Sequence, residues 1–259
     1  MDKNIISSDK ESLGYKDPSI LNTMKIKCVS KIFLYILFIL YLEACTEDKP
    51  TINIAVASNF EATLKKIITI YSSTHKEHEI NLISASSGIL TNQIINNAPF
   101  DLFLSADIEK PQFIYEKLKL KVEPKVYAIG KLALWIPNSS SGNCLDQLAN
   151  LKTLAIANPK TAPYGKIANK ILIENNIIIQ KTIQTSNVLQ AYIYTNDGLT
   201  DAGFVPYSLV NNKSNSCLQV FDNSELSQSI ILLNKKALDL YNFINSSEIQ
   251  QLILDSGYQ

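Results

Sequence analysis

Two serines stand where the chain is predicted to pass from a strand into a helix. Ser86 and Ser87 directly follow an apolar run, and apolar residues then recur at helical spacing, at Leu90 and Ile94. A serine in this position most often caps the helix, because its oxygen can accept an unpaired N–H of the first turn. The same position can hold an anion, because the first turn offers free N–H groups and the positive end of the helix dipole. The motif alone leaves both interpretations open.

A second segment upstream has the same design. Residues 52–57 alternate like a strand, Ser58 and Asn59 interrupt them, and residues 60–73 have helical periodicity. Two consecutive strand–helix units of an open α/β sheet would direct both helix starts over the carboxyl ends of the strands, where such folds bind ligands. The pair therefore strengthens the prediction of an anion site.

Two later helix starts supply further candidate donors. Pro163, Tyr164 and Gly165 end a loop before a predicted helix, and Val188 follows a Thr-Ser-Asn segment before another. The first N–H groups of each helix have no partner within the helix. Four segments of the chain can thus offer unpaired donors.

The charges of the chain restrict how an anion could be held. Basic and acidic residues number 24 each, and every basic residue is a lysine. This balance gives no indication of a nucleic-acid partner. Without arginine no guanidinium fork can grip an anion, so neutral N–H and O–H donors are expected to do so. His75 and His78 are the only histidines, and no zinc-binding spacing surrounds them, so no site for a free metal cation is expected.

The N-terminal region is predicted to be a targeting segment. Residues 1–23 are polar and are expected to be a disordered extension, with Met24 a candidate start, and residues 24–45 combine lysines with an eleven-residue apolar run. That run is short for a membrane span and suits a signal peptide. It ends in Leu-Glu-Ala-Cys, which resembles the lipobox of bacterial lipoproteins, with Cys45 as the lipidated residue. An ordinary signal peptide or an uncleaved anchor is the alternative. Either kind of signal peptide predicts an exported protein, which would be periplasmic or anchored to the cell envelope by its lipid.

Two cysteines remain beyond this segment. Cys144 and Cys217 could pair in an oxidising compartment, or they could stay as buried or free thiols. The sequence does not decide between these states, because pairing depends on how closely the two α-carbons approach.

Strands and helices alternate from residue 51 onward, the rhythm of an α/β fold with crossover helices. Asp107 is expected to cap the helix at residues 108–118, and the loop at 137–143 is a candidate domain crossing. Further strands are expected at residues 79–84, 101–105, 126–136 and 154–157, and residues 201–208 are expected to be a strand that continues into a loop. Two runs follow, at residues 218–221 and 230–233.

Five blocks of sequence together carry a family resemblance. They read AVASNF, ASSG, APFDLFLSAD, ANPKTAPYG and AGFV, at residues 55–60, 85–88, 98–107, 157–165 and 202–205. In this order they resemble the molybdate-binding periplasmic proteins of ABC transporters, which are type II periplasmic binding proteins. The resemblance implies a two-lobed α/β fold in which each lobe is a mixed, mostly parallel sheet flanked by helices. Residues 51–130 plus 212–259 would form lobe 1 and residues 131–211 lobe 2, with the ligand between them.

The resemblance also implies the residues that contact the ligand. These are Ser58, Asn59 and Ser87, together with the backbone N–H groups of Tyr164 and Val188. One branch of the family has a tyrosine directly after the strand at residues 202–205, and this chain has Pro206 there, which offers neither hydroxyl nor N–H. Tyr207 is a weaker candidate to replace it.

The implied function is the capture of molybdate or tungstate and its delivery to a transporter permease. Such a protein is expected to be a monomer and to have no enzymatic activity, no cofactor and no nucleic-acid partner. A binding protein of the same fold for sulfate, thiosulfate or a small organic acid is the alternative. A serine hydrolase using Ser58 or Ser87 is disfavoured, because the sequence has no Gly-x-Ser-x-Gly elbow and no suitably placed histidine.

Overall fold

The computed structural model describes residues 49–140 and 142–259. The extension at residues 1–23, the signal segment at 24–45 and the lipidation of Cys45 all lie outside the described residues, so these expectations stay predictions. Within the described part of the chain, no helix is long and apolar enough to cross a membrane.

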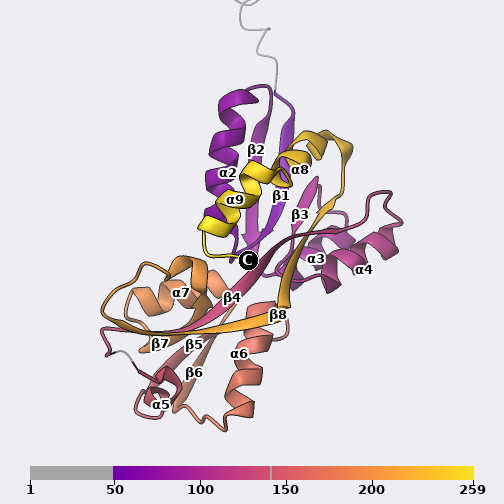
Figure 1. The fold of residues 1–259 in the computed structure, drawn as a ribbon. Helices are drawn as coiled ribbons and strands as arrows, with labels where there is room; N and C mark the ends of the chain where they lie inside the picture. The colour runs from indigo at the N-terminus through magenta and orange to yellow at the C-terminus, as the bar shows by residue number, and fades with distance from the viewer. Residues whose placement is uncertain (1–48, 141) are drawn as a thin grey trace, which may run out of the picture. The chain divides into compact units, whose positions relative to one another are not determined.

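Strands and helices alternate along the described chain, as the sequence predicts (Figure 1). The strands are β1 (Thr51–Ala57), β2 (Glu79–Ala85), β3 (Leu102–Leu104), β4 (Lys125–Pro137), β5 (Thr153–Ala157), β6 (Lys181–Thr185), β7 (Ala202–Pro206) and β8 (Ser216–Leu232). The α-helices are α2 (Glu61–Thr74), α3 (Ser87–Ile95), α4 (Glu109–Leu118), α5 (Cys144–Leu148), α6 (Pro163–Glu174), α7 (Val188–Asn196), α8 (Leu238–Ile244) and α9 (Ser247–Asp255). Two short 3₁₀ helices, η1 (Tyr207–Leu209) and η2 (Lys235–Ala237), complete the described elements.

All eight strands belong to one sheet in the order β2-β1-β3-β8-β4-β7-β5-β6. Pairing is parallel within β2-β1-β3 and within β7-β5-β6, and antiparallel where β8 and β4 join them. We call β2-β1-β3 the first half and β7-β5-β6 the second half; the long strands β4 and β8 are shared. The predicted mixed α/β fold is confirmed. The predicted lobes would divide this sheet along the shared strands, and that division stays a prediction.

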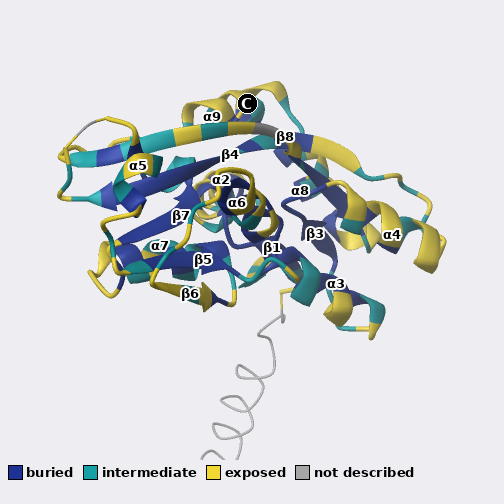
Figure 2. Ribbon diagram, turned by 90° about the horizontal axis from the view of Figure 1, so that it is seen from below, coloured by how far each residue is buried: buried dark blue, intermediate teal, exposed yellow. Residues whose placement is uncertain are grey.

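Each half has its own apolar core. In the first half, the strands β1, β3 and β8 and the helices α2, α8 and α9 bury residues such as Ile54, Leu64 and Ile253. In the second half, Leu154, Ile167 and Phe204 belong to a cluster that also receives β4. Figure 2 shows β5, β7 and most of β4 as buried, whereas parts of β8 and of the edge strand β6 and the outer faces of the helices are exposed. The two cores are joined through the shared strands β4 and β8.

Two strands differ from the sequence-based prediction. The runs at residues 218–221 and 230–233 belong to one strand, β8, which pairs with β4 along its length with two register shifts. The sequence pattern breaks between the runs because polar residues such as Asp222 and Ser224 occupy exposed positions there. Strand β6 was not predicted, because Lys181 and its neighbours form a polar, largely exposed edge of the sheet.

Cys144 and Cys217 form a disulfide bond that ties the start of α5 to β8. Both side chains are fully buried in the core of the second half. The alternative left open by the sequence, two free thiols, does not hold in the structure. Helix α5 has only five residues, so the covalent link supplies stability that so short a helix lacks.

Replacing Cys144 and Cys217 together by alanine should lower the free energy of unfolding by about 2–4 kcal/mol. The bond closes a loop with a sequence separation of 73 residues, and a loop of this length restricts the unfolded chain strongly. Urea unfolding of the variant and of the oxidised protein measures the difference. If the free energy of unfolding of the protein were the same before and after reduction of the disulfide by a thiol reductant, the expectation would be contradicted.

Candidate functional site

The turn after β1 is held against the end of β2. Strands β1 and β2 are parallel neighbours in register, with Ala57 opposite Ala85, so their carboxyl ends lie side by side. The N–H of Ser58 donates to the carbonyl of Ala85 at 3.0 Å. This pairing brings the Ser58-Asn59 turn next to the start of α3, as the two motifs in the sequence predict.

The start of α3 does not use its serines as conventional caps. Ser86 occupies the N-cap position, yet its side chain makes no capping bond, and its Oγ is buried without a hydrogen-bond partner. Ser87 Oγ accepts the N–H of Ala106 at 3.0 Å. That bond leaves the hydroxyl hydrogen of Ser87 available for a ligand. The plain capping interpretation is therefore wrong for both serines.

The second half contributes two helix starts to the same region. Tyr164 is the second residue of α6, which begins at Pro163, and Val188 is the first residue of α7. Asn187 caps α7 by accepting the N–H of Gln190, which fixes that helix start without using the N–H of Val188. The N–H of Leu189 reaches Ser58 Oγ at 3.5 Å, so the two halves meet here.

All five predicted ligand contacts line one small cavity. Ser58, Asn59, Ser87, Tyr164 and Val188 surround it, and the remaining lining residues are Ala57, Ser86, Ala106, Ala162 and Pro163. The cavity gives about 10 Å³ of room to the centre of a water-sized sphere, far below the roughly 300–1,000 Å³ of pockets for drug-sized ligands. No lysine and no carboxylate lines it. The cavity therefore suits a compact solute and carries no formal charge of its own.

Several donors around the cavity have no acceptor in the described part of the chain. The backbone N–H groups of Asn59, Ser87, Tyr164 and Val188 make no hydrogen bond there, although all four residues are buried. A buried N–H without an acceptor costs free energy, which an incoming acceptor recovers. An anion with several oxygens can accept from all of them at once. The arrangement is therefore chemically suited to an oxyanion.

The two halves touch directly near the cavity. The N–H of Gly88, in α3, donates to the carbonyl of Thr161, in the loop before α6, at 2.9 Å. A Cβ on Gly88 would lie 2.8 Å from that carbonyl oxygen, so a larger residue would force the backbone apart. Gly88 therefore permits the close approach of the two halves.

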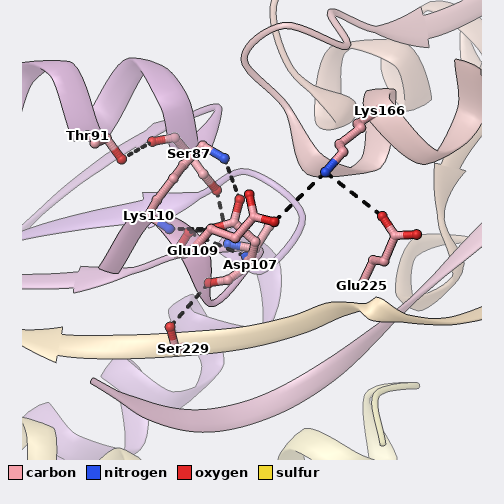
Figure 3. A network of polar contacts seen from close by, with 10 residues as sticks. Ser87, Thr91, Asp107, Glu109, Lys110, Lys166, Glu225 and Ser229 are labelled. Carbon is pink, nitrogen blue, oxygen red and sulfur yellow. Dashed lines mark hydrogen bonds and ion pairs between the residues drawn. The ribbon is translucent and has the colours of Figure 1, made fainter. Parts of the chain in front are cut away.

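A charged groove of about 410 Å³ lies beside the cavity. Lys166 of α6 reaches Glu109 of the first half at 3.9 Å and Glu225 of β8 at 4.0 Å (Figure 3). These side chains are well exposed, so each ion pair contributes little to stability. Asp107 accepts the N–H of Lys110 at 3.1 Å and also pairs with its ammonium, which agrees with the predicted capping role. Lys110 and Lys166 are thus paired with carboxylates outside the cavity.

A buried polar network that the sequence did not reveal lies next to Asn59. Its amide donates to Gln228 of β8 at 2.9 Å, and Gln228 also accepts the hydroxyl hydrogen of Tyr127 at 2.8 Å. Tyr258 donates to the carbonyl of Asn59 at 2.7 Å. Gln228 was missed because a single polar residue in a strand that is polar elsewhere gives no distinctive signal.

Tyr207 does not replace the tyrosine that the Pro206 position lacks. It is half-buried in η1, it packs against the apolar cluster that contains Val205 and Val210, and it does not line the cavity. Pro206 ends β7 opposite Leu132. Neither residue supplies a donor to the cavity.

The histidines lie away from the cavity as well. The ring of His75 stacks on the ring of Tyr71 with 4.0 Å between the ring centroids. Neither His75 nor His78 is among the residues that line the cavity with Ser58 and Ser87. Among the described residues no group of three or more histidines, cysteines and carboxylates could hold a metal ion. The cavity therefore contains no base next to a nucleophile, which a serine hydrolase requires.

A mixed sheet flanked by helices, with unpaired donors of both halves facing one closed cavity, defines the class of solute-binding proteins with a periplasmic-binding-protein fold. The sequence pattern of the bacterial extracellular solute-binding protein family matches residues 52–259, and this chain belongs to that family. The family resemblance found in the sequence is confirmed.

Two relatives and one solved structure agree with this assignment. The molybdate-binding protein ModA of Azotobacter vinelandii is 33% identical over 178 residues, which are 65% of this chain and 69% of the relative. The molybdate-binding protein ModA of Rhodobacter capsulatus is 31% identical over 221 residues, 79% of this chain and 86% of the relative. The structure of the periplasmic molybdate-binding protein of Azotobacter vinelandii has a TM-score of 0.69 at 24% identity and covers 80% of this chain and 98% of its own.

The buried tyrosines around the site should resist ionisation until the protein unfolds. Burial raises the pKa of Tyr127 and Tyr164 well above the usual value and that of Tyr258 to about 12. Because the folded-state pKa exceeds the unfolded value of about 10, the stabilisation is complete below pH 10 and is lost as the pH rises further.

An alkaline titration followed by phenolate absorbance tests this expectation. Tyr127→Phe should leave the titration of the native protein unchanged and remove signal only after unfolding. A loss of phenolate signal in the native range would show that Tyr127 ionises while folded, contrary to the prediction.

Proposed function

We propose that this chain captures molybdate or tungstate outside the cytoplasm and delivers it to the permease of an ABC transporter. The observation that carries the proposal is the set of unpaired, buried donors around a cavity without lysine. The names of the two ModA relatives support the choice of anion. As in those relatives, the expected role is binding and not catalysis.

Neutral dipoles suffice to hold a dianion in such a place. Each helix start contributes about 0.3–2 kcal/mol toward a negative charge, and charge–dipole attraction strengthens when water is excluded. The hydroxyls of Ser58 and Ser87 and the N–H groups of Asn59, Tyr164 and Val188 are the proposed donors. No other cofactor is needed for this function.

Selection among anions of equal charge would rest on distance. Sulfate and molybdate share shape and charge, but sulfate has shorter bonds to oxygen and would leave part of the donor set unpaired. Donors fixed by helix starts of two cores cannot follow a smaller anion without cost. The cavity therefore favours the larger oxyanions.

Entry of the anion requires the two halves to separate. Room of about 10 Å³ is close to the minimum for one water molecule, and a tetrahedral oxyanion has five heavy atoms. The binding cycle thus includes opening, capture and closure, and the closed form would present the surface that the permease recognises. We propose that the protein acts as a monomer, exported by residues 24–45 and anchored through a lipid on Cys45.

Thermal unfolding in the presence of oxyanions tests the anion directly. Molybdate and tungstate at one hundred times the dissociation constant should stabilise the purified protein by about 2.7 kcal/mol, because only the folded form binds them. Sulfate at the same concentration should cause no shift, and isothermal calorimetry gives the affinities. A response to sulfate, thiosulfate or a small organic acid alone would replace molybdate by that ligand.

Ser87→Ala should weaken molybdate binding by about 1–3 kcal/mol, because the variant removes a buried hydroxyl donor to a charged ligand. Ser73→Ala is the matched control, since its hydroxyl donates to the carbonyl of Ile70 on the exposed side of α2. Calorimetry of both variants measures the effect. Equal affinities for the two variants would exclude Ser87 from the donor set.

A further inference from the structure

The side chain of Tyr164 bridges the two halves of the protein at a place separate from its backbone N–H. Its hydroxyl oxygen lies 3.4 Å from the amide nitrogen of Asn59, in the first half, and 3.3 Å from that of Gln228, in the shared strand β8. All three side chains are buried. The backbone of Tyr164 therefore faces the cavity, and its side-chain hydroxyl faces the shared strands.

The orientation of this contact follows from its partners. The oxygen of Gln228 accepts from Tyr127 and from Asn59, so the amide nitrogen of Gln228 is turned toward Tyr164. The hydroxyl of Tyr164 is the only acceptor for that nitrogen in the described part of the chain. Burial keeps the hydroxyl neutral, since it raises the pKa of Tyr164 well above the usual value. Removing the hydroxyl would leave a buried donor unsatisfied.

A glycine in the shared strands leaves space for this hydroxyl. Gly130 lies in β4 at a register shift against β8. A Cβ there would lie 2.1 Å from the hydroxyl oxygen of Tyr164 and 2.4 Å from the amide nitrogen of Gln228. The backbone is thus shaped so that the ring of Tyr164 can reach across when the halves are together.

We propose that the Tyr164 hydroxyl is a positioning group that holds the closed form by joining Asn59 to the shared strand. This inference rests on the proposed function, which uses only the backbone N–H of Tyr164, and it adds a role for the Tyr164 side chain. Tyr164 belongs to α6, which departs with the second half on opening, whereas Asn59 and Gln228 stay with the first half and β8. The two contacts therefore exist only in the closed form, and their loss accelerates release of the ligand.

Tyr164→Phe tests this role, because it deletes the hydroxyl and keeps the ring and the backbone N–H. The two contacts are longer than a typical N–H···O bond, but their loss leaves the buried amide of Gln228 unsatisfied, so the dissociation rate of molybdate should rise about tenfold. The association rate of molybdate and the melting temperature of the ligand-free variant should equal those of the protein without the substitution, because the open form lacks the contacts. Stopped-flow kinetics and thermal unfolding measure both.

Tyr71→Phe is the matched control, since Tyr71 is an equally buried tyrosine whose hydroxyl has no partner in the described residues. It should leave both rate constants unchanged. Gly130→Ala provides a second variant, expected to accelerate dissociation by displacing the hydroxyl. Equal dissociation rates in the Tyr164 and Tyr71 variants would refute the inference while leaving the proposed function intact. If the protein without any substitution bound neither molybdate nor tungstate, both the inference and the proposed function would be overturned.

Discussion

Buried backbone N–H groups without an acceptor are the feature on which the rest of this structure depends. A folded chain normally pairs such groups, and leaving one unpaired costs about 1–3 kcal/mol. Here four of them, on Asn59, Ser87, Tyr164 and Val188, face one cavity from two separate cores. The fold accepts this cost where a ligand with several oxygens can recover it. Because no lysine is among the described lining residues, the number and position of the donors, and not net charge, would define the preferred ligand.

The sheet explains how donors so far apart in sequence converge. Parallel pairing of β1 with β2 places the Ser58-Asn59 turn beside the start of α3, and parallel pairing of β5 with β6 and β7 does the same for α6 and α7. Only β4 and β8 run through both halves, and their register shifts occur near Gly130, where Tyr164 crosses. One continuous sheet thus carries both sets of donors, and β4 and β8 are the strands that connect them.

The closed arrangement is secured by contacts of different strength. The backbone bond from Gly88 to Thr161 and the buried hydroxyl of Tyr164 act where water is excluded. The pairs of Lys166 with Glu109 and Glu225 lie at the exposed rim, where solvent screens them. The contacts between the halves thus include buried polar contacts near the cavity as well as exposed ion pairs at its rim.

The sequence by itself determined the alternation of strands and helices, the α/β class, the family and the positions of the helix starts that surround the cavity. These follow from periodicity and from short motifs such as Ser-Asn and Ser-Ser-Gly, which are local properties of the chain. Only the tertiary structure decided that Ser86 and Ser87 do not cap their helix, that Cys144 and Cys217 pair, and that β8 is one strand. Gln228 and Gly130 also acquired a role only through their neighbours. The reason is physical: capping, disulfide formation and side-chain networks depend on distances between residues remote in sequence, which no local pattern encodes.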